Sequence, residues 1–190
     1  GGRINRLYRF INTAPLSSEF FGDLYLKDKK KFIYHYNIFI NKTSLLLKEI
    51  GVNINTVPVL DIRVKGSSNI IGNRAFSHNT DVINFLGNFC INSFHRNKIG
   101  TVMKHIPRHG LAKVDSHNFT PTVNAKINYL EKNDFSTFKN KKSFFAMTAQ
   151  IIFKNIDKIN TTTHSKKVIQ LIRDTIKFNN LLMSDDISMK

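Results

Sequence analysis

The sequence predicts an α/β fold in which the strands of a parallel sheet alternate with helices. Four short apolar runs each end in polar residues, as strands buried on both faces of a sheet do. The runs close at residues 61, 105, 148 and 185, about every forty residues, and longer stretches with helical periodicity connect them. Four such units suit half of an eight-fold, TIM-type (β/α)8 barrel. A doubly wound sheet is the competing fold, but no Gly-rich phosphate fingerprint follows a strand.

The expected elements can be placed in order along the chain. The predicted strands cover residues 54–61, 101–105, 144–148 and 181–185. Apolar stripes at helical spacing predict helices over 32–50, 82–90 and 168–175, with two weaker helical turns between 124 and 140. We expect Gly51 to end the first helix, and Asn79 or Thr80 to cap the second with Asp81 in its first turn. The aromatic side chains in these stripes are interpreted as core.

The composition excludes several classes of protein. A chain of 190 residues fits one domain or part of a larger one, and its 41% of apolar residues suffice for a core, which excludes wholesale disorder. The single cysteine, Cys90, excludes a disulfide scaffold and a cysteine-based zinc cluster. No run approaches the ~18 apolar residues that a membrane span needs, so no membrane partner is expected.

The net charge of +16 could indicate a nucleic-acid partner. The lysines are dispersed, however, and the densest run, Lys27–Lys31, stands at the polar start of an apolar-periodic segment, as on the solvated face of a helix. The abundance of Lys, Asn, Ile and Phe is also typical of an AT-rich coding bias, which raises the charge without any function. We therefore expect no nucleic-acid partner.

Polar residues end all four predicted strands. In a β/α barrel the active site lies at the carboxyl ends of the strands. Any single Asp at a strand end is more often a helix cap than a catalyst, but four polar ends that converge on one rim point to a functional site. The residues at these ends are Asp61, Lys104–His105, Thr148–Gln150 and Asp185–Asp186.

The segment after the second predicted strand concentrates histidines. His105, His109 and His117 fall within thirteen residues, together with Asp115. A metal site is one interpretation, although no spacing matches a zinc pattern and no cysteine is near. The other is that Asp115 fixes the tautomer of His117 and stabilises its charged form, which would make His117 a proton shuttle. The residues by themselves leave both open.

Seven motifs in this sequence occur in the same order in one known family. Residues 104–110, KHIPRHG, resemble the KH[FI]PGHG motif of glycoside hydrolase family 3, in its bacterial β-N-acetylglucosaminidase branch. The other matching segments are DSH at 115–117, VPVLD at 57–61, IGNRAF at 71–76, MTAQ at 147–150, SDDISM at 184–189 and GGRINR at 1–6. The resemblance covers almost the whole chain, and the pairing of DSH with SDD[IL]SM is specific to this branch.

The resemblance implies a retaining glycoside hydrolase without cofactor or metal, which removes terminal non-reducing β-linked N-acetylglucosamine. Its substrate would be a carbohydrate, typically a muropeptide in cytoplasmic peptidoglycan recycling, and the complete protein would be a monomer. Asp185 matches the family nucleophile, the first Asp of SDD. His117 matches the general acid/base, and Asp115 is its partner.

Four further residues are implied to bind the sugar. Arg74 matches the Arg of the IG[DN]R motif, and Lys104 and His105 match the Lys-His of KH[FI]P. Arg6 matches the Arg that closes the first motif. These roles suit the chemistry, because a retaining glycosidase needs a carboxylate nucleophile and a proton donor at the leaving oxygen. A histidine donor titrates near neutral pH and adds no second negative charge, so phosphorolysis stays open as a variant.

The sequence departs from the family pattern in three places. Arg108 stands where the motif has glycine, and it is expected either to be strained, if its φ is positive, or to add a cation near the mouth of the site. Gln150 stands where the motif has His, and the Asp of the first motif would precede Gly1. We therefore expect residues 1–190 to be a partial catalytic barrel, covering roughly strands 4 to 7 and inactive by itself.

Two other functions compete with the N-acetylglucosaminidase. One is a family member that cleaves a different β-glycoside. The other is a non-catalytic basic protein that binds carbohydrate or polyanions, which the charge and Arg108 would favour. The presence of both His117 and Asp185 argues against the loss of catalysis.

Overall fold

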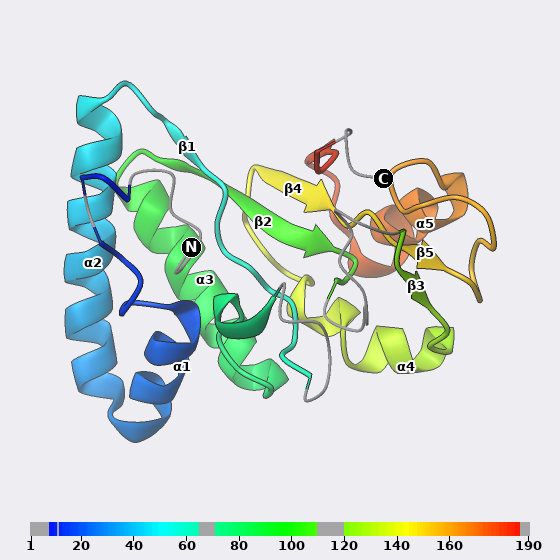
Figure 1. The fold of residues 1–190 in the computed structure, drawn as a ribbon, viewed down its shortest axis with the longest axis horizontal. Coiled ribbons are helices and arrows are strands. Elements are labelled where there is room, and N and C mark those ends of the chain that lie inside the picture. The colour runs from blue at the N-terminus through cyan, green and yellow to red at the C-terminus, as the bar shows by residue number, and fades with distance from the viewer. Residues whose placement is uncertain (1–7, 11, 65–70, 110–119, 187–190) are drawn as a thin grey trace.

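The computed structural model describes residues 8–10, 12–64, 71–109 and 120–186. Its centre is a four-stranded parallel sheet in the order β1-β2-β4-β6 (Figure 1). The strands are β1 (Ile54–Asn55), β2 (Gly100–Ile106), β4 (Phe145–Thr148) and β6 (Leu181–Met183). The predicted α/β fold with a parallel sheet is confirmed, whereas the share of a barrel that these strands cover stays a prediction.

Helices lie between the successive strands of this sheet, and two further helices precede its first strand. The α-helices are α1 (Ser18–Lys27), α2 (Lys29–Glu49), α3 (Thr80–Arg96), α4 (Ile127–Lys132) and α5 (Lys166–Leu171). Short turns of other helix types are η1 (Gly72–Arg74), η2 (Phe135–Thr137) and η3 (Ile172–Ile176). Figure 1 shows α1 and α2 at one end of the molecule and α5 at the other, with the sheet between them.

The local signals explain where the helices begin and end. Asn79 caps α3, because its side-chain oxygen accepts hydrogen bonds from two backbone N–H groups of the first turn, at 2.8 and 3.3 Å. Gly51, with φ of +77°, follows α2 in a conformation that glycine adopts without strain. Asp28 separates α1 from α2 and accepts from the N–H of Lys31. Helix α1, capped by Ser17, was not predicted.

The first strand is much shorter than predicted. The N–H of Val57 donates to the carbonyl of Asn55 within the same segment, and Pro58 has no N–H to offer. Pairing with β2 resumes at Val59, which bridges Lys104 in parallel. A second, two-stranded parallel sheet, β3 (Thr122–Val123) with β5 (Ile152–Phe153), was not predicted.

The core is aromatic where α1, α2 and α3 meet. The rings of Phe21 and Tyr36 lie 4.5 Å apart, and those of Tyr25 and Phe85 stack at 4.8 Å. Phe32 lies in the same cluster and is completely buried. The interpretation of the aromatic stripes as core is therefore confirmed.

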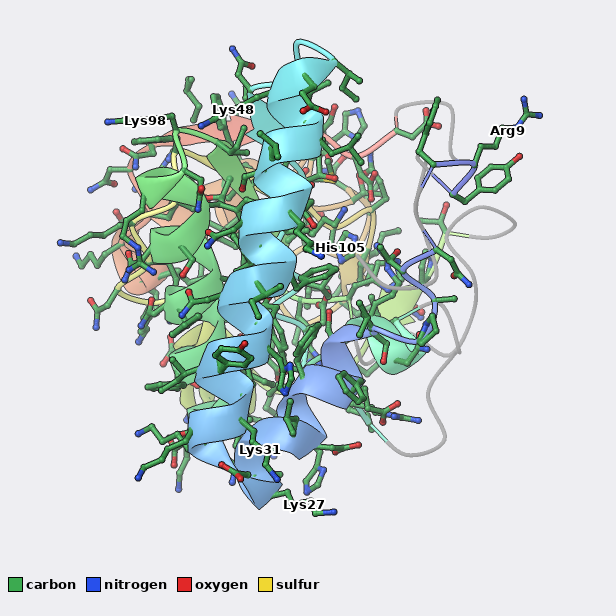
Figure 2. All side chains as sticks on the ribbon, turned by 90° about the vertical axis from the view of Figure 1, so that its left-hand side faces the viewer. Arg9, Lys27, Lys31, Lys48, Lys98 and His105 are labelled. Carbon is green, nitrogen blue, oxygen red and sulfur yellow. The ribbon has the colours of Figure 1, made fainter. Side chains whose placement is uncertain are left out.

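The helical layer carries its lysines at separate places. Figure 2 shows Lys27 and Lys31 at one end of this layer and Lys48 and Lys98 at the other, whereas His105 lies within the molecule. In the part of the chain that the structure describes, no helix combines the length and the apolar character that crossing a membrane requires.

Candidate active site

The carboxyl ends of β1 and β2 are joined by backbone hydrogen bonds. The N–H of Lys104 donates to the carbonyl of Pro58 at 3.0 Å, and the N–H of Leu60 donates to the carbonyl of Lys104 at 2.7 Å. Because Asp61 follows Leu60 directly, these bonds fix its carboxylate beside the end of β2. Of the four strand ends predicted to converge, these two therefore lie side by side.

The carboxylate of Asp61 binds two histidines at the rim formed by the carboxyl ends of the strands. One carboxylate oxygen, Oδ2, lies 2.7 Å from Nδ1 of His105 and accepts the backbone N–H of His105 at 3.2 Å. The other, Oδ1, accepts the backbone N–H of His109 at 2.5 Å. Burial alone would raise the pKa of Asp61, but the charge and hydrogen bonds of His105 and His109 outweigh it and lower the pKa to about 2. Asp61 is therefore a buried carboxylate at neutral pH.

His105 lies between two carboxyl groups. Its Nδ1 contacts Asp61, and its Nε2 lies 3.9 Å from Oδ2 of Asp185. The bond to Asp61 orients the ring, so that the opposite nitrogen is presented to Asp185. Asp185 follows β6, its side chain is 22% exposed, and its Oδ1 accepts the N–H of Asp186 at 2.9 Å. Of the two carboxylates that flank His105, Asp185 is therefore the one that a ligand can reach.

Two buried cations complete the rim. Arg74 ends η1 and is 7% exposed, and Lys104 is 9% exposed. Burial, together with the charge of Arg74, lowers the pKa of Lys104 to about 8, while Asp185 and Asp61 oppose this shift. The rim therefore holds hydrogen-bond donors of positive charge beside an accessible carboxylate, which suits a neutral, hydroxyl-rich ligand.

The structure brings together four of the seven predicted site residues, which are Arg74, Lys104, His105 and Asp185. Arg6, Asp115 and His117 lie outside the described residues. At the end of β4, Thr148 Oγ1 lies 2.8 Å from Thr163 Oγ1, and Gln150 is buried. Across the described ranges, no three His, Cys, Asp or Glu side chains gather as a metal site would require.

Neither expectation for Arg108 is correct. Its φ is not among the positive values of non-glycine residues, so the backbone is not strained. Its side chain is 1% exposed and forms a buried ion pair with Asp134, so it adds no free cation to the mouth of the site. Asp134 could not be identified beforehand, because no motif or periodicity in the sequence connects it with Arg108.

The family follows from a comparison with known proteins. Residues 37–190 match the profile of the glycosyl hydrolase family 3 N terminal domain. The chain belongs to this family. A beta-hexosaminidase of Idiomarina loihiensis is 30% identical over 146 residues, which cover 76% of this chain and 44% of that protein. A beta-hexosaminidase of Methylobacillus flagellatus is 29% identical over 195 residues, which cover 100% of this chain and 55% of that protein.

Solved structures share the fold of this glycosyl hydrolase family 3 chain. NagZ from Neisseria gonorrhoeae, in complex with N-trifluoroacetyl-D-glucosamine, superposes with a TM-score of 0.83 at 23% identity. The superposition covers 90% of this chain and 52% of that chain. The chain thus spans about half the length of these two beta-hexosaminidases and of this NagZ chain.

Proposed function

We propose that the protein containing this chain is a retaining β-N-acetylhexosaminidase that removes terminal, non-reducing β-linked N-acetylglucosamine. One observation carries the proposal. An accessible carboxylate, Asp185, lies at the carboxyl end of a parallel sheet, 3.9 Å from a histidine that a buried carboxylate orients. The beta-hexosaminidase names of the relatives support the sugar, and muropeptides of peptidoglycan recycling are the proposed source.

The proposed reaction is a double displacement. Asp185 attacks the anomeric carbon while His117 donates a proton to the leaving oxygen, which gives a covalent glycosyl-enzyme and the free aglycone. His117, now neutral, then takes a proton from water, whose oxygen attacks the anomeric carbon and releases Asp185. Asp115 would hold the ring of His117 and stabilise its charged form.

The rim around Asp185 supports binding of the sugar. Lys104 and Arg74 are donors that can bind hydroxyl groups, and burial excludes water that would compete for them. His105 is held by Asp61, so a hydrogen bond between its Nε2 and a sugar hydroxyl would need little reordering. NagZ from Neisseria gonorrhoeae was solved in complex with N-trifluoroacetyl-D-glucosamine, which supports a carbohydrate as the class of ligand.

The test is an assay of the whole protein with a chromogenic β-N-acetylglucosaminide, with the matching β-glucoside as control. We expect turnover of the first and little of the second. A fluoroglycoside that traps the glycosyl-enzyme should label Asp185, and Asp185→Ala should abolish turnover. Label on Asp186, or equal turnover of both substrates, would contradict the proposal.

Phosphorolysis is the second candidate. The buried cations Arg74 and Lys104 lie in this rim, and a histidine donor would add no negative charge that repels phosphate. Phosphate oxygen would then replace water in the second step and form the sugar 1-phosphate. Adding inorganic phosphate to the assay separates the two, because only phosphorolysis yields the sugar 1-phosphate as the main product.

A further inference from the structure

Arg108 and Asp134 form an ion pair inside the molecule, next to the candidate active site. Nη1 of Arg108 contacts Oδ2 of Asp134, and both side chains are 1% exposed. Arg108 belongs to the segment that follows β2, whereas Asp134 lies between α4 and η2. The pair therefore ties the end of a central strand to the helical segment beside it.

Stability alone is a poor explanation for this pair. Burying two charges costs free energy that their attraction often fails to recover, and apolar side chains of similar volume frequently serve a fold as well or better. The titration of Asp134 reflects this cost. Burial raises the pKa of Asp134 to about 6, although Arg108 favours the carboxylate.

The ion pair fixes Arg108, which directly precedes a residue that donates a hydrogen bond within the candidate active site. The next residue, His109, donates its backbone N–H to Oδ1 of Asp61 at 2.5 Å. The other oxygen of Asp61 binds the ring and the backbone of His105, whose Nε2 is turned to Asp185. A shift of Arg108 would therefore move the His109 N–H and loosen Asp61, and with it the ring of His105.

Asp134 is a firm anchor for this arrangement. Its carbonyl accepts the side-chain hydroxyl of Thr137 at 2.9 Å, and the neighbouring Phe135 is completely buried. The carboxylate itself caps no helix, because η2 has no side-chain cap. The side chain of Asp134 is thus available to hold Arg108 while its backbone is fixed by the core.

We propose that Arg108 and Asp134 are positioning residues, whose ion pair clamps the end of β2 so that Asp61 keeps His105 facing Asp185. The proposal rests on the proposed hydrolase function, since turnover is one of its readouts. It assigns no contact with the sugar to either residue. Both act through the His109 N–H and Asp61.

The experiment compares variants of the whole protein. Arg108→Met with Asp134→Leu removes both charges and keeps apolar volume, so this double variant is expected to melt near the wild-type temperature. Its kcat on the chromogenic β-N-acetylglucosaminide should fall at least about tenfold, because small misplacements of catalytic groups cost that much or more. KM should change less than about threefold, and Arg108→Lys should recover part of kcat.

A second readout is independent of turnover. The ring Nδ1–H of His105, hydrogen-bonded to the Asp61 carboxylate, should give a low-field proton NMR signal, and the loss of that signal in Asp61→Asn would assign it. In the double variant this signal should shift or broaden. Ile40→Ala, which truncates a completely buried side chain of α2, is the matched control for lost stability. It should lower the melting temperature but leave kcat and the His105 signal as in the wild type.

The outcomes are distinct. A stable double variant with wild-type kcat and an unchanged His105 signal would overturn the proposal, because the pair would then have only a structural role. If the double variant fails to fold, Asp134→Asn decides, because it removes the charge of the pair at nearly constant volume, and wild-type kcat with an unchanged His105 signal in that variant would also overturn the proposal. If the wild type itself turns over no glycoside, the proposed function fails, and the His105 signal alone then supports or overturns the clamp.

Discussion

His109 is a histidine that the fold keeps uncharged. It is 4% exposed, and burial lowers its pKa to about 4, with the nearby His105 acting in the same direction and Asp61 against it. Its backbone N–H binds Asp61, so the residue serves the site through its main chain. An uncharged ring at this place spares the rim a further positive charge beside Lys104.

The titration of His109 predicts a pH dependence of stability. An unfolded histidine titrates near pH 6.5, so the unfolded chain binds more protons between about pH 4 and 6.5, and stability is lost as the pH falls through this window. Relative to His109→Gln, the wild type should lose about 3 kcal/mol of unfolding free energy between pH 7 and pH 4. Urea unfolding of both proteins across this range checks it, and parallel stability curves would contradict it.

His117 provides the second prediction at the level of the residue. In the whole protein, His117→Ala should slow glycosides with poor leaving groups far more than activated aryl glycosides, because the latter need little protonation. Asp115→Ala should act in the same direction but less. Rates measured over a series of leaving groups check this, and equal losses across the series would mean that His117 has a structural role.

The sequence identified the residues of the rim better than their connections. The family motifs marked Arg74, Lys104, His105 and Asp185, and the polar ends of predicted strands marked the last three independently. The sequence did not show that Asp61 binds two histidines. Both partners lie more than forty residues away, and they bind through backbone N–H groups as well as a ring.

Among the elements, the close approach of α1 to the segment just after η1 depends on one glycine. A Cβ built on Gly22 would lie 1.8 Å from the carbonyl oxygen of Phe76, which is backbone and cannot swing aside. In α3, a Cβ on Gly87 would lie 2.6 Å from the end of the Leu60 side chain, which can rotate. A Gly→Ala substitution would therefore meet backbone in α1 but a side chain in α3.

These contacts predict that alanine is poorly tolerated at position 22 and well tolerated at position 87. Gly22→Ala should lower the free energy of unfolding by about 1–3 kcal/mol, because α1 must move away from the segment that carries Arg74. Gly87→Ala should stay within about 1 kcal/mol of the wild type, since the gain in helix propensity offsets a side-chain shift. Thermal unfolding of both variants checks the contrast, and a larger loss in Gly87→Ala would refute this view of the packing.

Periodicity explains which elements could be predicted. Helices α2 and α3 carry long apolar stripes, and β2 and β4 are compact apolar runs, so their patterns stand out. Strands β3 and β5 have two residues each, which is too short for any period to be recognised. In β1 the pattern continued beyond the real strand, because apolar residues after Pro58 are buried without regular pairing.

For the whole molecule, the spacing of the predicted strands in the sequence was enough to predict a parallel sheet with helical crossovers. It was not enough to predict how the edges of that sheet are covered. Steps of about forty residues predict parallel crossovers, whereas the described sheet ends at β1 on one side and β6 on the other. Leu181 and Met183 of β6 are 65% and 41% exposed, so an apolar surface stands at an edge. Exposed apolar edge strands favour association with other chains.

We therefore predict how the 190 residues behave when produced alone. They should associate, and should turn over no N-acetylglucosaminide, because an open sheet cannot hold the site groups in place. Leu181→Lys with Met183→Lys should reduce the association, as charges on an edge strand do in other proteins. Sedimentation velocity of both proteins checks this, and a monomeric, active 190-residue chain would disprove it.

The aromatic cluster between the first three helices gives the protein an optical signal of its own. The chain has no Trp, and Tyr36 is 4% exposed among Phe rings, whereas Tyr8 and Tyr34 are largely exposed. Burial raises the pKa of Tyr36 well above that of a free phenol. Its near-ultraviolet circular dichroism therefore reports the integrity of the helical layer, and its ionisation in alkaline solution should appear only when that layer opens.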